Sequence, residues 1–179
     1  MSLLERLAIL LVSICLSVGL IALLTGFFAS HDQGTLSSST VAGHGFRDLG
    51  NRRLREGQRR PRYDSRPPTS GAHFAVPVTR DEATLSNDQL LGALAAGNVV
   101  ILYGTPQPPP GLTSLAHALA RPFTPALVQS GQAVILARRP GTAGLIGLAW
   151  THLIRTSSVL DPRLREFAAF WLGRGAPPG

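Results

Sequence analysis

Apolar residues run from residue 7 to residue 28 without a charged side chain between them. As a helix, these 22 residues would extend about 33 Å, which is enough to cross the hydrocarbon core of a bilayer. The apolar region of a cleaved signal peptide is normally shorter, and no clear small-x-small cleavage site follows this one. The pattern therefore predicts a membrane anchor over residues 1–29, with a cleaved signal peptide as the alternative.

The C-terminal half has the hydrophobic periodicity of a folded domain. Ser86 or Asn87 can cap a short helix over residues 89–96, and Gly97 ends it. Residues 99–103 are continuously apolar and rich in β-branched side chains, which is typical of a strand buried on both faces. We expect this strand to be central in a sheet.

Further elements follow along the chain. Leucines and alanines from residue 112 form one apolar helical face, and Pro122 stops that helix. Apolar runs at 134–137 and 145–153 predict two more strands, with Trp150 as a large core residue of the second.

The last predicted helix has the clearest sequence pattern. Asp161 is placed to cap it, Pro162 occupies its first position, and Gly173 follows its end. Its apolar side chains recur at helical spacing: Leu164, Phe167, Ala168 and Trp171. The sequence thus predicts a small globular domain over residues 63–179, with an α/β or α+β fold, a short mixed sheet and about three helices.

Basic residues are concentrated between the predicted anchor and the predicted domain. All 17 basic residues are arginines, and the formal net charge is +7. Eight of the arginines lie between Arg47 and Arg66. Residues 30–65 as a whole are rich in Ser, Gly, Thr and Arg and lack a sustained apolar period. We therefore expect residues 30–62 to form a loosely ordered tether.

The tether arginines suggest contact with anionic lipid headgroups through phosphate neutralisation. The candidates for that contact are Arg52, Arg53, Arg55, Arg59 and Arg60. Only Phe46 and Tyr63 accompany the arginines, and a single-strand nucleic-acid surface normally interleaves more aromatics. We do not expect nucleic-acid binding.

Charges near the predicted anchor indicate how it is oriented in the membrane. Arg6 and the N-terminal amine favour a cytoplasmic N-terminus, whereas the arginines beyond residue 47 oppose it weakly because of their distance from the anchor. We expect a single-pass protein of the cell membrane with its C-terminal domain outside the cytoplasm.

The most distinctive motif is Tyr63-Asp64-Ser65-Arg66-Pro67-Pro68-Thr69-Ser70-Gly71-Ala72-His73. It resembles the Tyr-Asn-Ser-x-Pro-Pro-Thr-Ser-Gly-Pro-His signature of the bacterial domain-of-unknown-function family 3105, whose members are commonly membrane-anchored or exported. Residues 97–103 and the closing Gly173-Arg174-Gly175 also resemble that family's pattern. The resemblance covers roughly residues 50–179.

The resemblance also shows what this chain lacks. Members of that family usually carry His-Asn-Leu-Glu-His-Gly where this chain has residues 92–97, and Gly-His where it has Gly50-Asn51. Of the imidazoles implied as metal ligands, only His73 remains, and one His cannot make a zinc site. The only cysteine, Cys15, lies in the apolar segment. We expect no metal, and no nucleotide, haem or calcium pattern indicates another cofactor.

Ser70 and His73 are the weak candidates for catalysis, because a Ser near a His suggests a nucleophile and its base. The alternative is structural: Pro67 and Pro68 set a rigid turn, while Thr69, Ser70 and His73 bond the surrounding loop.

Three functional hypotheses remain. The first is a non-enzymatic accessory domain with a protein partner in the membrane or envelope. The second is a hydrolytic or metal-handling enzyme that uses His73 with Ser70, or with Asp64 and Asp81. The third is lipid-surface binding by the tether.

Overall fold

The computed structural model describes residues 41–177. In that range no helix has both the length and the apolar composition that crossing a membrane requires. The anchor predicted at residues 7–28 lies outside the described residues, as does the first part of the predicted tether.

A five-stranded mixed sheet forms the centre of the domain, in the order β1-β7-β6-β4-β5. Only β4 and β5 run parallel, and every other neighbouring pair is antiparallel. The strands are β1 (His44–Gly45), β4 (Val99–Tyr103), β5 (Val134–Arg138), β6 (Leu145–Ala149) and β7 (His152–Thr156). All five residues of β4 are buried and the strand has a neighbour on each side, which confirms the prediction of an interior strand.

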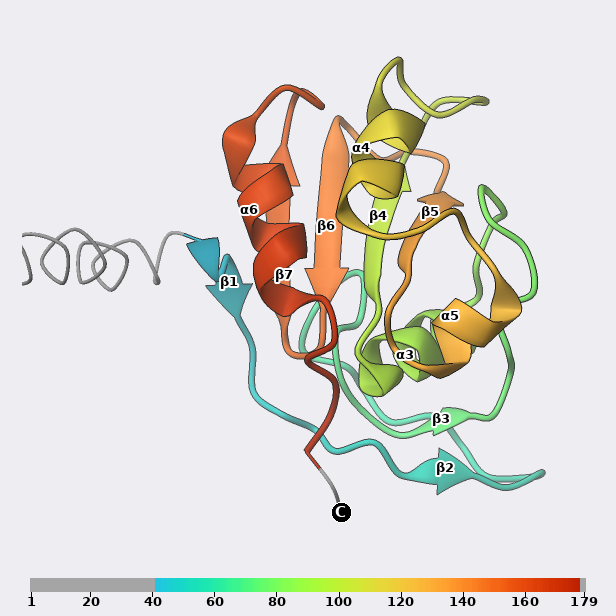
Figure 1. Cartoon of the computed structure of the whole chain (residues 1–179). Coiled ribbons are helices and arrows are strands. Elements are labelled where there is room, and N and C mark those ends of the chain that lie inside the picture. The colour runs from blue at the N-terminus through green and yellow to red at the C-terminus, as the bar shows by residue number, and fades with distance from the viewer. Residues whose placement is uncertain (1–40, 178–179) are drawn as a thin grey trace, which may run out of the picture. The chain divides into compact units, whose positions relative to one another are not determined.

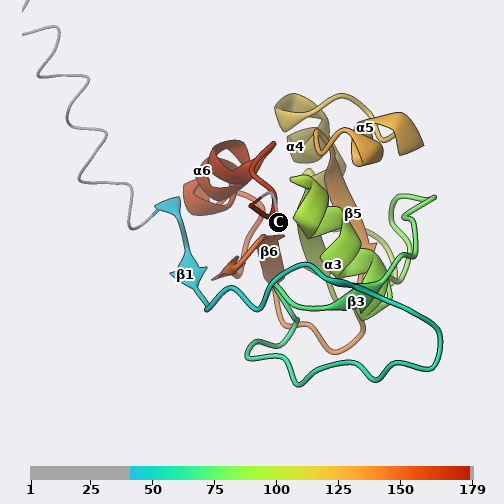
Figure 2. The ribbon, with the colours of Figure 1, turned by 90° about the horizontal axis from the view of Figure 1, so that it is seen from below.

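Helices cover both faces of this sheet (Figures 1 and 2). Val100 and Leu102 of β4 share one apolar cluster with α3 (Asn87–Ala96) and α5 (Pro125–Gln129). The alternate β4 residues share the other cluster with α4 (Leu112–Leu119) and α6 (Pro162–Trp171). The fold is α+β, with four helices in the described part.

The helix that the sequence analysis missed is α5. Thr124 caps it with its side chain, Pro125 is its first residue, and it is five residues long. A helix this short spans little more than one turn, so it shows no hydrophobic period that could be recognised in the sequence.

The single strand predicted over residues 145–153 is wrong. β6 and β7 form an antiparallel hairpin instead, and its turn contains Trp150 and Thr151. Thr151 has a positive φ of 61°. This turn contains no glycine or asparagine, so the usual sequence signal for a tight hairpin is absent. Trp150 is 3% exposed, which confirms its predicted place in the core.

α3 is capped by Ser86 and ends at Gly97 as predicted, but it begins at Asn87, two residues before the expected start. The Ser86 side chain accepts a hydrogen bond from the Gln89 N–H, and the Gln89 side chain accepts one from the Ser86 N–H, which together form a capping box. Gly97 ends the helix in a left-handed conformation. The Gly97 carbonyl then accepts the Gly173 N–H at 2.8 Å, so the C-terminal segment packs on the end of α3.

The described part of the predicted tether differs from a loosely ordered arm. β1 pairs with β7, and β2 (Arg53–Leu54) pairs in parallel with β3 (His73–Phe74). The Trp171 indole donates to the Ala42 carbonyl at 3.0 Å. Residues 41–62 are therefore part of the domain, held by strand pairing and by polar side-chain bonds, neither of which leaves a hydrophobic pattern in the sequence.

Asn98 ties three elements together inside the domain. Its Nδ2 donates to the carbonyls of Ala93 and Val128, and its Oδ1 accepts the Ala133 N–H at 2.9 Å. Asn98 is 1% exposed, so water cannot replace these partners.

We predict that Asn98→Ala lowers the free energy of unfolding by about 3 kcal/mol, because it leaves buried backbone groups unpaired. Urea denaturation would measure the change. Asn51→Ala, at an exposed position, is the matched control and should change stability little. Equal effects of the two substitutions would contradict this role for Asn98.

Candidate functional site

The motif of residues 63–73 folds into a turn, which we call the signature turn. Its inner side is occupied by structural hydrogen bonds. The Ser70 hydroxyl donates to the Arg47 carbonyl at 3.0 Å and accepts the Leu49 N–H at 3.1 Å. The Thr69 hydroxyl lies 3.1 Å from that of Ser65, and both side chains are buried. These hydroxyls connect the turn to itself and to the segment that precedes it.

Tyr63 and Gly71 close the same turn. The Tyr63 hydroxyl donates to the Ala72 carbonyl at 3.0 Å, and burial raises the pKa of this phenol. Gly71 has a φ of 124°, and a Cβ there would lie 2.9 Å from the Tyr63 ring. A larger residue at position 71 would collide with the ring. Pro67 follows a cis peptide bond and is buried, as is Pro68.

His73 is fully buried at the end of the turn. Its Nδ1 lies 2.9 Å from the Gly71 carbonyl, and since a carbonyl can only accept, Nδ1 carries the proton. Burial lowers the pKa of His73, so the neutral ring dominates at neutral pH.

The geometry does not assemble the proposed catalytic pairs. Among the described residues, no hydrogen bond joins His73 to Ser70, Asp64 or Asp81. Asp81 instead accepts the Leu136 N–H at 2.8 Å, and Asp64 is exposed. The sole Ser70 proton is directed to a carbonyl, so no base is placed to remove it. Within residues 41–177, no group of three or more His, Cys, Asp or Glu side chains is arranged to hold a metal.

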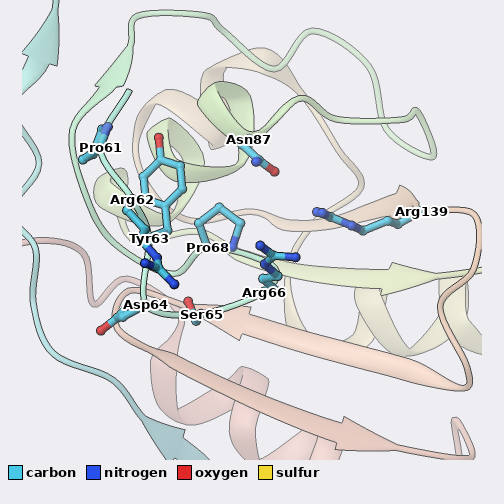
Figure 3. Close-up of a pocket in the computed structure, with 9 residues that line it drawn as sticks. All are labelled: Pro61, Arg62, Tyr63, Asp64, Ser65, Arg66, Pro68, Asn87 and Arg139. Atoms are coloured by element: carbon cyan, nitrogen blue, oxygen red, sulfur yellow. The ribbon is translucent and has the colours of Figure 1, made fainter. Parts of the chain in front are cut away.

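The outer side of the turn forms a hollow of about 680 Å³, which we call the arginine hollow (Figure 3). In Figure 3 the side chains of Arg66 and Arg139 point toward each other, with Asn87 beside them. The turn supplies most of the wall, and two distant segments complete it. The lining residues are Pro61, Arg62, Tyr63, Asp64, Ser65, Arg66, Pro68, Asn87 and Arg139.

The hollow is electropositive. It contains three arginines against the single carboxylate of Asp64, and within residues 41–177 none of these four side chains forms a salt bridge. Asn87 is the first residue of α3, so the positive end of that helix dipole also lies at the wall. Proline and tyrosine surfaces provide apolar contacts between the charges. Such a site suits a carboxylate or phosphate group attached to a larger body.

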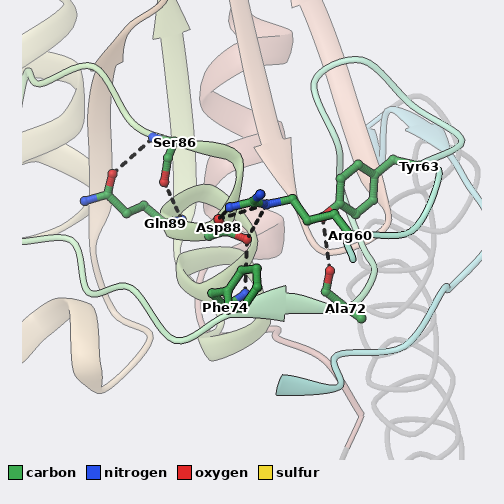
Figure 4. A network of polar contacts seen from close by, with 7 residues as sticks. All are labelled: Arg60, Tyr63, Ala72, Phe74, Ser86, Asp88 and Gln89. Atoms are coloured by element: carbon green, nitrogen blue, oxygen red, sulfur yellow. Dashed lines mark hydrogen bonds and ion pairs between the residues drawn. The ribbon is translucent and has the colours of Figure 1, made fainter. Parts of the chain in front are cut away.

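The lipid-surface candidates are not equivalent in the structure. Arg60 forms a bidentate salt bridge with the nearly buried Asp88, with Nη2 2.5 Å from Oδ2, and its guanidinium lies 4.9 Å from the centre of the Phe74 ring (Figure 4). Arg60 thus joins the segment before the turn to α3. Arg52 donates weakly to Gln58 at 3.4 Å, and Arg53 lies on β2. Arg55 and Arg59 are exposed.

Sequence reasoning selected the signature turn but missed two partners of its outer side. Asn87 lies nineteen residues beyond Pro68, and Arg139 lies after β5. Asn87 was considered only as a possible helix cap, and Arg139 belongs to no recognisable motif. Only the folded arrangement brings the two residues to the hollow.

We predict that Ser70→Ala lowers the free energy of unfolding by about 2 kcal/mol, because the Leu49 N–H and the Arg47 carbonyl lose their partner. Ser114→Ala on the exposed face of α4 is the matched control. Urea denaturation of both variants would measure the difference. Unchanged stability of Ser70→Ala would contradict the structural role.

Asp88 makes part of the stability depend on pH. Burial acts to raise the pKa of Asp88, but the Arg60 side chain and the Phe74 N–H outweigh it, so the net pKa is lowered. A lowered folded pKa means that the stabilisation is complete above the unfolded value of about 4 and is lost as pH falls through the folded value.

We therefore predict that Asp88→Asn destabilises the protein by an amount that is constant from pH 7 to pH 5 and shrinks at more acidic pH. Urea midpoints of the wild type and the variant, measured across this range, test it. A difference that persists unchanged to pH 2.5 would show that the ion pair is not its source.

Comparison with known proteins bears on the same region. A family model described as a protein of unknown function (DUF3105) matches residues 56–178, which include the whole signature turn and the arginine hollow. No curated protein and no solved structure matches the chain. Because the family model covers more than half of the sequence, the chain belongs to the DUF3105 family.

Proposed function

We propose that this protein is a membrane-anchored, non-enzymatic accessory protein that binds an acidic group of a protein partner in the arginine hollow. Residues 7–28 would hold it in the cell membrane, and the domain would lie outside the cytoplasm. The apolar length of that segment and the charge at its N-terminal side support this arrangement.

The proposal rests on the difference between the inner and the outer side of the signature turn. Its hydroxyls and imidazole face inward and are bonded to the backbone, as Ser70 and His73 illustrate. Its charged side chains line an open hollow in which three guanidinium groups lack a carboxylate partner among the described residues. Buried hydroxyls without a base do not favour catalysis, whereas unpaired arginines around a hollow favour binding of an anion.

A protein partner fits these features better than a lipid surface does. The walls of the hollow include Pro61, Pro68 and the Tyr63 ring, so apolar surface accompanies the charge. Arginine together with tyrosine is typical of binding hot spots in protein interfaces. A flat bilayer would instead engage exposed side chains such as Arg55 and Arg59, which lie outside the hollow.

The test is gentle extraction of the full chain with a C-terminal tag from its native membrane, followed by identification of proteins that co-purify in near-equal amounts. We predict that the double variant Arg66→Glu, Arg139→Glu lowers partner recovery at least tenfold while the melting temperature stays within about 2 °C of the wild type. Both side chains line the hollow without a salt bridge in the described part, so the fold does not depend on them.

The control is the double variant Arg121→Glu, Arg165→Glu, which makes the same change of charge at exposed positions outside the hollow. It should retain the partner. Equal loss in both double variants would indicate general charge attraction, such as to anionic lipid. A wild-type protein that purifies alone would contradict the proposal.

A further inference from the structure

β1 covers only the first part of the outer edge of β7. The register pairs His44 with Leu153, and no described strand lies beside residues 154–156 on that side. The Ala42 carbonyl accepts the Trp171 indole, so the chain before β1 runs toward α6 rather than along β7. The second half of β7 therefore has an open edge within the described part of the chain.

The opposite edge of the sheet is closed. The Glu82 N–H donates to the Leu136 carbonyl of β5, and the Arg138 N–H donates to the Ala83 carbonyl. An uncovered strand edge offers backbone donors and acceptors with which another chain can pair. Of the two edges of this sheet, the β7 edge is the one that keeps such a stretch among residues 41–177.

The backbone groups of Arg155 face the open edge. In an antiparallel ladder the N–H and C=O of alternate residues point to the same neighbour. The Phe46 N–H donates to the Thr151 carbonyl at 2.7 Å, and Leu153 lies opposite His44, so Arg155 is the next residue of β7 that points to this side. In the described range its N–H and C=O have no strand partner there.

An apolar hollow of about 380 Å³ lies beside this edge, and we call it the edge hollow. Residues paired across a ladder share a face of the sheet, which brings the side chains of β1 and β7 together here. The His44 and Phe46 rings pack edge to face, with their centres 4.7 Å apart. The hollow suits a large apolar side chain of a partner. The lining residues are His44, Phe46, Arg66, Leu153, Ile154 and Arg155.

Arg66 joins the edge hollow to the arginine hollow, because it lines both. Arg155 Nη2 donates to the Arg66 carbonyl at 2.9 Å. Neither guanidinium forms a salt bridge within the described part of the chain. The open edge is therefore bordered by an apolar hollow and by two arginines, and it attracts an acidic partner rather than a basic one.

We propose that the partner presents an extended acidic segment, which adds as a strand to the open edge of β7. One apolar side chain enters the edge hollow, and a carboxylate two residues away binds at Arg66 in the arginine hollow. Alternate residues of a strand lie on one face, so this spacing brings both side chains to the same surface. Backbone pairing contributes affinity, and the two hollows contribute specificity. A second copy of this chain would bring the same arginines to the edge, and like charges oppose that pairing.

This inference rests on the proposed function, and two peptides of equal composition test it directly. The first, acetyl-Thr-Glu-Thr-Leu-Thr-Glu-Thr-amide, has its acidic residues two positions from leucine, on the same face. The second, acetyl-Glu-Thr-Thr-Leu-Thr-Thr-Glu-amide, has them three positions away, on the opposite face. In titrations of the full chain in detergent, the first peptide should bind about tenfold more tightly. Equal affinities, or no saturable binding of the first peptide, would overturn the inference.

Hydrogen exchange locates the bound strand. The first peptide should slow exchange of the Arg155 amide about tenfold, because this N–H gains a carbonyl partner. The amide of Arg121, at an exposed position outside both hollows, should exchange at its original rate. Saturable binding that leaves the Arg155 amide unprotected would also overturn the inference.

Two variants isolate the backbone donor. Arg155→Pro and Arg155→Ala both lack the guanidinium, but only the proline variant lacks the outward N–H. Proline is tolerated at a strand edge where the N–H does not serve the ladder. Arg155→Pro should bind the first peptide about fivefold more weakly than Arg155→Ala. Equal binding by two folded variants would contradict strand pairing, and the exchange measurement on the wild type decides if the proline variant does not fold.

Failure of this inference can be told apart from failure of the proposed function. Partner recovery that depends on Arg66 and Arg139, together with an unprotected Arg155 amide, would overturn the added strand and leave the proposed function standing. Protection of Arg155 by the first peptide, in a protein that purifies from its membrane without a partner, would support the strand site and contradict the proposed function.

Discussion

Burial of β4 on both faces is the constraint on which the rest of the domain depends. A five-residue apolar strand with neighbours on both sides must be covered above and below, and its alternating side chains divide the core into two clusters. α3 and α5 cover one face, and α4 and α6 cover the other. The signature turn and the arginine hollow lie around this layered core.

The signature turn shows why polar sequence motifs need not be catalytic. Its hydroxyls satisfy backbone groups of the neighbouring segment, such as the Leu49 N–H, which an apolar side chain could not do. The same arrangement leaves Arg66 of the turn, and Arg62 just before it, exposed to solvent. In the proposed function, one short segment therefore supports the fold on one side and binds a partner on the other.

The sequence predicted those helices and strands whose apolar pattern and caps lie within or next to the element itself. β4, α3 and α6 have continuous or periodic apolar residues and recognisable caps, and the structure confirms all three. The hairpin of β6 and β7 was missed because Trp150 and Thr151 do not form a recognisable turn sequence. The order of residues 41–62 was missed because their partners are distant backbone groups.

The candidate sites were predictable to a similar extent. The turn that builds the arginine hollow was selected from its residues, and His73 was selected as an isolated imidazole. Arg139 could not be linked to the hollow, because its proximity arises from the end of β5. Gly92 was noted only for the ligand type that it lacks, whereas the structure places it beside Arg53 and His73.

The bond between Trp171 and Ala42 has a consequence for biosynthesis. It joins residues 129 positions apart, and the β1 pairing with β7 likewise joins the first described strand to the last. A ribosome makes the chain from its N-terminus, so residues 41–45 emerge long before their partners exist. Their docking must wait until β7 and α6 have been synthesised, so this domain cannot be completed before its last helix leaves the ribosome.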